Sequence, residues 1–401
     1  MCSYANESLI ISVIISLNQN HQINYTKEEK SFDSIRSLKL TNFRSHESLS
    51  FLLSGKPLTI VGQNAVGKTN ILEAISLLSP GRGLRNSNLN DLSNTKNMNG
   101  WGVKAKIISN NETIDISTGM REGSTGREVK INEKKVSGSS HLPKFFSLYW
   151  LTPSMDQIFL ESPSYRRRFI DRLCSIYKHN HISHIRQYEK LMRERNQFLK
   201  SNIQDEKWLD KIEYQMARES IPIAINRIDL VEELSKLLDC SVDSVWPKAS
   251  LKINGLVENL ISLWNPEKAE KEVSTILRRN RRKDFLSKRT NEGIHRSDLE
   301  VFEKNKNIAA YKSSTGEQKG LLLSIIITHL ELVSNKTSRY PVLLLDEVVA
   351  HLDEVRRASL FKKIFDSGAQ VIMTGTDLTL FDEFKNILDI FILNMGKLKE
   401  V

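Results

Sequence analysis

The chain has 401 residues, of which 39% are hydrophobic, 7% aromatic and 26% charged. This composition is typical of a soluble globular protein, and the length allows two or three compact units. Lysine and arginine total 58 against 48 acidic residues, a formal charge of +10, which permits a polyanionic partner such as nucleic acid.

The cysteines and the first apolar run indicate the cellular compartment in which the protein is expected. Cys2, Cys174 and Cys240 are scattered without C-x-x-C spacing, which argues against a disulfide framework or a zinc site and fits a reducing cytoplasm. Residues 9–17 are apolar but far short of the ~20 residues of a membrane span, and no Lys or Arg precedes them as in a secretory signal. The sequence predicts a cytoplasmic protein without membrane insertion.

The first convincing strand begins only at Ile35. Residues 1–34 are therefore interpreted as an extra strand, a disordered arm, or the product of a start codon assigned too early. Residues 35–40 alternate apolar and polar side chains, which predicts a half-exposed strand, and residues 49–53 predict a returning one.

A phosphate-binding loop is predicted between a buried strand at 58–61 and a helix near residue 70. Residues 62–69 fit G-x-x-x-x-G-K-[ST], in which the glycines let backbone amides face phosphate oxygens at the positive end of a helix. Lys68 is predicted to reach the β- and γ-phosphates of ATP, and Thr69 to hold Mg²⁺. An ordinary glycine-containing turn is the alternative, which the strand–loop–helix context disfavours. The predicted nucleotide-contacting residues are Gly62, Gln63, Asn64, Ala65, Val66, Gly67, Lys68, Thr69 and Asn70.

The middle of the chain changes from strand to helix. Residues 103–136 alternate in short segments separated by turns, which predicts an antiparallel meander. Helical patterns cover about 165–202 and 207–238, with an interruption predicted at Pro222. No heptad repeat is sustained there, so a long coiled-coil arm is not expected.

Two basic clusters lie in this helical region. Residues 161–200 contain ten Lys or Arg against four acids, and five of the six residues at 278–283 are basic. Such runs indicate either a solvated helix face or a surface for nucleic acid or an acidic partner.

The last hundred residues supply two further motifs. A buried strand beginning near 341 ends in Asp346 and Glu347; the first is predicted to hold Mg²⁺ and the second to orient or deprotonate the attacking water. Buried strands are also predicted at 370–377 and 389–393. Because these acids lie far from the phosphate-binding loop in the sequence, an inserted lobe is predicted to interrupt one ATPase domain.

Residues 314–318, Ser-Thr-Gly-Glu-Gln, open an apolar helix and resemble the signature of ABC-type ATPases. In that class, this helix start contacts the γ-phosphate held by a second head, so Ser314 and Gly316 are expected to act in trans in an ATP-dependent homodimer. The predicted fold is α/β: an ABC-type P-loop ATPase head with an antiparallel β-meander, interrupted by a mostly α-helical lobe. The predicted domains are an N-terminal extension at 1–34, head segments at 35–160 and 301–401, and the helical lobe at 161–300.

From about Ile35 to the C-terminus the sequence also resembles the RecF family, at residues 42–45, 81–83, 162–171, 293–299 and 345–353. The resemblance implies a DNA-repair ATPase head, ATP-dependent dimerisation, slow hydrolysis, binding to duplex DNA near gaps without sequence specificity, and loading of RecA with RecR and RecO. It also implies that Arg44 contacts the nucleotide phosphates and that Asp353 belongs to a loop coupling two heads.

The sequence departs from the ABC pattern at two positions. Thr376 and Asp377 stand where many ABC ATPases carry a switch histidine, which predicts slow turnover. Gln157 is the candidate for the glutamine that joins head and lobe. His295 is open between a catalytic or interface role and a packed or surface one, whereas the remaining two histidines considered, His329 and His351, are assigned to structure.

The resulting prediction is an ATP-dependent DNA clamp of recombinational gap repair and replication-fork recovery, reset by slow ATP hydrolysis. A transporter ATPase subunit is one rival, but the insert at 161–300 is too long and too basic for it. A chromosome-condensing or end-processing ATPase is another, but it needs long heptad arms. Glu347 argues against a third rival, a scaffold that binds ATP without hydrolysing it.

Overall fold

The structure is a computed structural model that describes residues 31–96, 99–124, 126–201, 205–240 and 245–401. The predictions made for residues 1–30 lie outside this range. The chain divides into two compact units: one runs to Met155 and resumes at Leu330, and the other covers Asp156–His329. Residues 301–329 therefore belong to the helical unit in the structure. The sequence prediction assigns them instead to the second part of the ATPase head. None of the helices in the described ranges is both long and apolar enough to cross a bilayer.

A six-stranded sheet forms the core of the first unit, in the order β17-β16-β4-β15-β14-β9. All neighbouring strands are parallel except the antiparallel edge pair β16 and β17. Strands buried on both faces read as continuous apolar runs, which is why the sequence reveals them. The strands are β4 (Leu58–Val61), β9 (Leu148–Leu151), β14 (Val342–Leu345), β15 (Val371–Gly375), β16 (Asp389–Asn394) and β17 (Lys397–Glu400).

A second, antiparallel sheet of the first unit has the order β3-β2-β5-β6-β7-β8 and confirms the predicted meander. Alternate residues of β2 and β5, among them Leu38, Leu40, Val103 and Ala105, are buried, whereas their neighbours face outward. The strands are β2 (Ser34–Phe43), β3 (His46–Leu52), β5 (Gly100–Ser109), β6 (Glu112–Arg121), β7 (Glu128–Ile131) and β8 (Lys134–Val136).

Residues just before Ile35 also belong to the first unit. A short strand β1 (Ser31–Phe32) pairs in parallel with β13 (Arg339–Tyr340). Asp33 is fully buried, and its carboxylate accepts hydrogen bonds from Ser109 Oγ at 2.6 Å and Ser147 N at 2.9 Å. The other helices that the first unit contains in full are α2 (Lys68–Ser76), α10 (Glu354–Ser367) and the 3₁₀ turns η1 (Leu89–Leu92), η2 (Ser139–Lys144), η6 (Val349–His351) and η7 (Leu378–Phe384).

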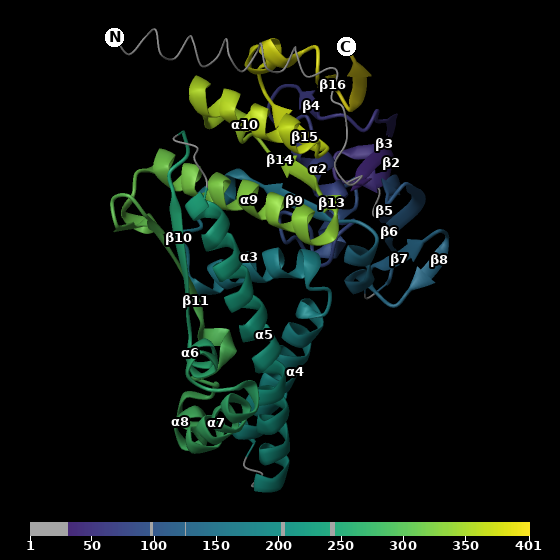
Figure 1. Ribbon diagram of the computed structural model, residues 1–401. Helices are drawn as coiled ribbons and strands as arrows, with labels where there is room; N and C mark the ends of the chain where they lie inside the picture. Colours follow the sequence, from purple (N-terminus) through teal and green to yellow (C-terminus); the bar gives the residue numbers. More distant parts are fainter. Residues whose placement is uncertain (1–30, 97–98, 125, 202–204, 241–244) are drawn as a thin grey trace. The chain divides into compact units, whose positions relative to one another are not determined.

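The second unit is mostly helical, and Figure 1 shows α4 beside the longer α5. It also holds an antiparallel sheet, β10-β11-β12, that the sequence does not predict. The helices are α3 (Pro163–Tyr177), α4 (His181–Lys200), α5 (Glu206–Cys240), α6 (Leu256–Leu263), α7 (Pro266–Arg279) and α8 (Arg281–Ser287); the strands are β10 (Ala249–Asn254), β11 (Asp298–Glu303) and β12 (Ile308–Ala309). Two 3₁₀ turns, η4 (Ile294–Arg296) and η5 (Ala310–Lys312), lie here, η3 (Pro153–Gln157) crosses the first division, and α9 (Thr315–Thr337) crosses the second.

The interruption predicted at Pro222 is wrong, because α5 continues through it. A proline inside a helix removes one backbone donor and normally kinks or breaks the helix. Here Pro222 lies between the buried side chains of Ile221 and Ile223, which belong to the core of the second unit. Burial of these side chains offsets the missing hydrogen bond, so tertiary packing overrides the local signal.

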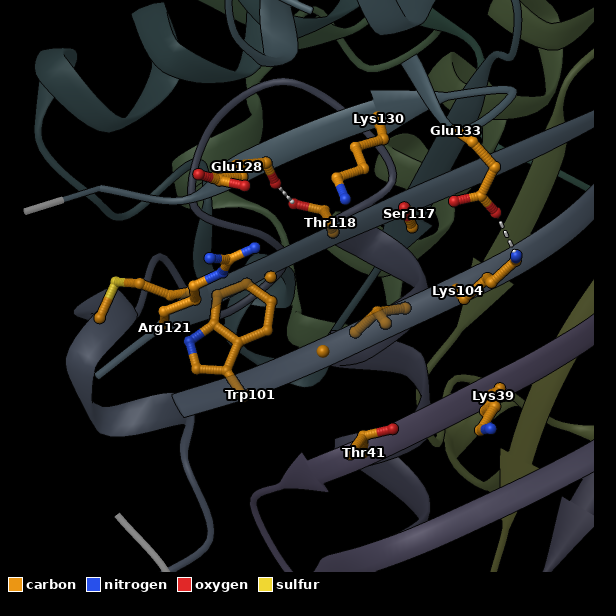
Figure 2. A pocket seen from close by; sticks show the side chains of 14 residues that line it. Lys39, Thr41, Trp101, Lys104, Ser117, Thr118, Arg121, Glu128, Lys130 and Glu133 are labelled. Carbon is orange, nitrogen blue, oxygen red and sulfur yellow. Dashed lines mark hydrogen bonds and ion pairs between the residues drawn. The ribbon is translucent and has the colours of Figure 1, made fainter. Parts of the chain in front are cut away.

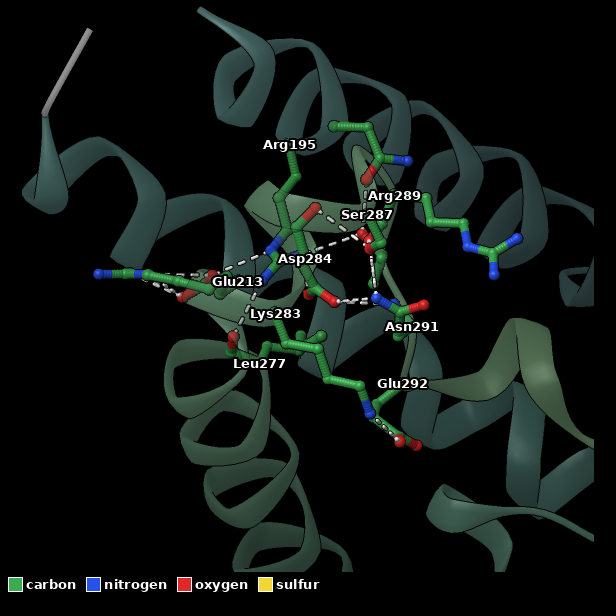
Figure 3. A network of polar contacts seen from close by, with 12 residues as sticks. Arg195, Glu213, Leu277, Lys283, Asp284, Ser287, Arg289, Asn291 and Glu292 are labelled. Atoms are coloured by element: carbon green, nitrogen blue, oxygen red, sulfur yellow. Dashed lines mark hydrogen bonds and ion pairs between the residues drawn. The ribbon is translucent and has the colours of Figure 1, made fainter. Parts of the chain in front are cut away.

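A buried ionic network fixes α4, α5, α7 and α8 to one another (Figure 3). The Arg195 side chain is fully buried and donates to Glu213 Oε1 at 2.9 Å, Asp284 Oδ2 at 2.7 Å and Thr290 Oγ1 at 2.9 Å. It also donates to the Leu277 carbonyl at 2.9 Å. Buried charges are costly unless they are paired and hydrogen-bonded, and this guanidinium satisfies two buried carboxylates at once.

We expect Arg195→Met to lower the free energy of unfolding by about 3–5 kcal/mol, because the buried Asp284 loses its counter-ion and Glu213 keeps only Arg281. Arg193→Met, two positions away on the exposed face of α4, is the matched control and should change it by less than about 0.5 kcal/mol. Chemical denaturation of both variants measures the difference. Equal stabilities would contradict the structural role given to Arg195.

Candidate functional site

The loop between β4 and α2 has the backbone of a phosphate-binding loop. A Cβ added to Gly62 would lie 2.5 Å from the Leu393 carbonyl oxygen, so only glycine fits there. Gly67 has φ +105°, and a Cβ there would lie 2.5 Å from Ser45 Oγ and 2.8 Å from His46 Nε2. The first amides of α2 have no intrahelical acceptors, so this helix start can hold an anion.

Lys68 is the first residue of α2 and folds back over the loop. Its Nζ donates to the carbonyl oxygens of Gly62 at 2.7 Å and Gln63 at 2.9 Å, and lies 3.9 Å from Glu347 Oε1. Burial lowers the pKa of the Lys68 amine, while the charges of Glu347 and Asp346 act in the opposite direction. An anion in the loop would therefore meet a positioned ammonium group.

The two residues predicted to hold Mg²⁺ meet in the structure. Thr69 Oγ1 donates to Asp346 Oδ1 at 2.9 Å, although they belong to opposite ends of the chain. A hydroxyl and a carboxylate are the hard oxygen donors that Mg²⁺ accepts, and the ion usually keeps water or phosphate oxygens in its other positions. The residue types fit this ion. No group of three or more His, Cys, Asp or Glu side chains within the described ranges is arranged to hold a metal.

Thr374 on β15 is a site residue that the sequence reading missed. Its hydroxyl donates to Asp346 Oδ1 at 2.8 Å and accepts from the Glu347 amide at 2.9 Å. Thr374 is fully buried, so both bonds are shielded from water. The sequence signal that could have identified Thr374 is its position as the single hydroxyl residue in an otherwise apolar strand, β15.

Glu347 has an unusual backbone conformation, with φ +52°. The left-handed region is costly for a residue with a side chain and persists where surrounding contacts enforce it, commonly at functional sites. The bond to Thr374 supplies one such contact. The Glu347 side chain keeps 33% of its surface exposed beside Lys68, so water can reach its carboxylate.

The turn after β2 supports the phosphate-binding loop from behind. His46 is 2% exposed, and its Nε2 lies 3.1 Å from the Gly67 carbonyl oxygen. A carbonyl only accepts, so Nε2 is the protonated nitrogen; burial lowers the pKa of His46 and favours this neutral ring. Asn70 Nδ2 also donates to Ser45 Oγ at 2.8 Å. His46 was not identified from the sequence, which gave no sign of this contact.

Arg44 is held by a buried carboxylate rather than by the loop. Its Nε and Nη2 each donate to Glu73 at 3.0 Å, and Nη2 also donates to Ser87 Oγ at 2.8 Å. Glu73 is fully buried and also lies 3.4 Å from Arg85. The contact between Arg44 and the nucleotide phosphates remains a prediction. The Arg44–Glu73 ion pair is compatible with such a contact but does not require it.

The signature residues lie in the second unit, at the start of α9. Ser314 N donates to Glu317 Oε2 at 3.0 Å and Glu317 N donates to Ser314 Oγ at 3.4 Å, which is a reciprocal helix cap. A hydrogen bond from Lys306, followed by those from Ser314, lowers the pKa of Glu317 to about 2. Ser314 and Gly316 are exposed, so the helix start is accessible from outside this unit.

The remaining candidates have surface or packing roles in this structure. Asp353 caps α10 by accepting from Arg356 N at 2.8 Å, and Gln157 is an exposed residue at the end of η3. His295 contacts the Tyr188 hydroxyl at 2.8 Å and the Thr290 carbonyl at 3.1 Å. Burial lowers its pKa to about 4, which favours the packed interpretation.

A phosphate-binding loop, two acids after a parallel strand and a capped signature helix define an ABC-type ATPase head. The model of the RecF/RecN/SMC N terminal domain matches residues 34–399, and the chain belongs to the RecF family within it, as the following relatives show. DNA replication and repair protein RecF of Rhizobium etli (strain CIAT 652) is 38% identical over 367 residues, 91% of this chain and 98% of that protein. RecF of Rickettsia bellii (strain OSU 85-389) is 39% identical over 352 residues, 88% and 97% of the two chains.

A solved structure shares the fold. The recombination mediator protein RecF-ATP in the RecFOR pathway matches with a TM-score of 0.81 at 24% identity, covering 94% of this chain and 100% of that one. The predicted fold class and family are therefore confirmed.

We expect Thr374→Val to lower the ATP hydrolysis rate by about 10-fold or more, because Asp346 and the Glu347 amide both lose a positioning bond. ATP affinity should change little, since the loop and Lys68 are intact. Thr113→Val, at an exposed position of β6 in the same unit, is the control. Steady-state hydrolysis and fluorescent-nucleotide titration separate the two effects. A normal rate in Thr374→Val would contradict the positioning role.

Proposed function

We propose that this chain is an ATP-dependent DNA-binding clamp of recombinational gap repair and replication-fork recovery, which slow ATP hydrolysis resets. The meeting of Thr69 with Asp346, beside Lys68 and Glu347, is the observation that carries this proposal. Its membership of the RecF family, whose members are named DNA replication and repair proteins, supplies the biological setting.

ATP with Mg²⁺ is the proposed ligand. Residues 62–70 would hold its phosphates through backbone amides, with Lys68 supplying positive charge and Thr69 and Asp346 the metal ligands. When bound, Mg²⁺ would neutralise charge on the phosphates. The absence of a Cβ at Gly62 and Gly67 lets the loop adopt this backbone conformation, and the Thr69–Asp346 hydrogen bond lies at the end of the loop.

Glu347 is the proposed group that orients or deprotonates the attacking water. Its exposed carboxylate, fixed backbone and position beside Lys68 support this role. Because Thr376 and Asp377 replace a switch histidine, γ-phosphate sensing would be weak and turnover slow. The enzyme would be a slow, DNA-linked ATPase.

Two chains would close around ATP. Ser314 and Gly316 of one chain would contact the γ-phosphate held by the loop of the other, and Asp353 would couple the two heads. The exposed start of α9 supports this arrangement, because an anion from outside the unit can reach the positive end of the helix. Hydrolysis removes the γ-phosphate and with it part of the interface, which would release the dimer.

DNA is the proposed macromolecular partner, in duplex form near single-strand gaps and without sequence specificity. RecR, and through it RecO and RecA, are proposed partners on the basis of the family, and the cytoplasm is the proposed compartment. A net charge of +10 suits a phosphate backbone, and affinity should fall steeply with salt.

The test is binding of a fluorescent gapped duplex with ATP·Mg²⁺, with ADP·Mg²⁺ and without nucleotide. We expect ATP to tighten binding by about 10-fold or more, as expected for a coupling of more than about 1.4 kcal/mol. Ser314→Arg should still bind ATP but lose this gain, because the bulky cation blocks the helix start. Ser183→Arg, at the start of α4 in the same unit, is the control. DNA binding that ATP does not change would contradict the clamp.

A further inference from the structure

The outward face of the meander carries a row of lysines that cross-strand register aligns. Lys39 lies opposite Lys104, which lies opposite Ser117, then Lys130 and then Lys135. Directly paired residues of neighbouring strands project from the same face, so these five side chains form one line across five strands. At about 4.8 Å between strands, the line extends over about 19 Å.

A hollow runs beside this row because two paired positions of the adjacent row are glycines. Thr41 pairs with Gly102, and Gly102 pairs with Gly119 on the next strand. The resulting hollow has a volume of about 370 Å³. Figure 2 shows it bordered by Lys39, Lys104 and Lys130, with Glu128 and Glu133 also at its edge. Trp101 and Arg121 lie at the other side of the same hollow.

Much of the positive charge in this row has no carboxylate partner. Lys104 lies 2.6 Å from Glu133, and Lys135 lies 2.8 Å from Glu128. Within the part of the chain that the structure describes, neither Lys39 nor Lys130 has an ion pair within 4.0 Å. Lys104 also lies 3.7 Å from Asp115, so its charge is neutralised within the sheet. The positive charge left for a ligand is that of Lys39 and Lys130.

The basic clusters that the sequence singled out are different, because carboxylates inside the helical unit neutralise much of them. Arg166 binds Asp298 at 2.7 Å, and Arg281 binds Glu213 at 2.7 Å. Arg195 is fully buried in the network of Figure 3. On the sheet face, by contrast, strand register places the lysines in one line.

We propose that the lysine row and the hollow beside it bind the sugar–phosphate backbone of DNA. The row is linear, as the ligand is, and lysine ammonium groups bind phosphates as point charges without reading bases. The Ser117 and Thr41 hydroxyls can donate to phosphate oxygens. An acidic protein segment is the less favoured occupant, because the row itself carries only lysine and serine side chains, whereas protein interfaces are centred on aromatic and apolar anchors. This inference rests on the proposed DNA-binding function and names the surface that performs it.

The decisive variant is Lys39→Gln/Lys130→Gln, since removing these two lysines leaves no paired carboxylate behind. Lys397→Gln/Lys399→Gln, two exposed lysines on β17 of the same unit, is the matched control. Affinity for a fluorescent gapped duplex is measured with ATP·Mg²⁺ between about 50 and 200 mM KCl. We expect the slope of log K against log[KCl] to become shallower by about 2, and affinity at about 100 mM KCl to fall about 10-fold or more. The control should match wild type.

Gly102→Glu is an independent second variant that retains every lysine. A Cβ at Gly102 meets only Thr41 Cβ, at 3.9 Å, so the strand can accept a side chain that fills the hollow with negative charge. We expect weaker DNA binding with unchanged ATP binding and melting temperature. If wild type bound DNA and both variants bound it equally well with the same salt slope, the lysine row would be overturned while the clamp stood. A wild type that did not bind DNA would overturn both.

Discussion

The candidate site depends on one constraint: parallel strands present their carboxyl ends at the same edge of a sheet. β4 leads into the phosphate-binding loop, β14 ends before Asp346, and β15 lies between them. The bond from Thr69 to Asp346 closes the site at 2.9 Å, and Thr374 of the middle strand ties Asp346 to the Glu347 amide. The sheet therefore brings together residues that a whole helical unit separates in sequence.

Local patterns predicted the parts of the fold that local chemistry controls. The glycines of the loop, the apolar strand before Asp346 and the alternation of the meander each report a backbone or burial requirement at their own position. Thr374, His46 and the β10–β12 sheet could not be predicted, because their roles come from partners far away in the chain. The helix break predicted at Pro222 was wrong for the same reason, since packing against buried residues of other helices stabilises α5.

The sequence also could not predict which basic side chains lie at the surface and which are paired. Arg195 reads in the sequence as part of a basic helical surface, yet its side chain is fully buried between two carboxylates. No sequence pattern singles out Lys39 or Lys130. They become members of one row only through strand register. β2 carries Lys39 and turns into β3, whose first residue, His46, contacts Gly67, so this hairpin joins the polar face to the phosphate-binding loop.

The most direct test of the two-headed ATP mechanism is the mass in solution of Glu347→Gln, with and without ATP·Mg²⁺. The substitution removes the carboxylate that would activate water while leaving Lys68, Thr69 and Asp346 in place, so bound ATP should persist. The mechanism predicts a monomer that becomes a lasting dimer only when ATP is present. A protein that binds ATP yet stays monomeric would contradict the trans role of Ser314 and the clamp built on it.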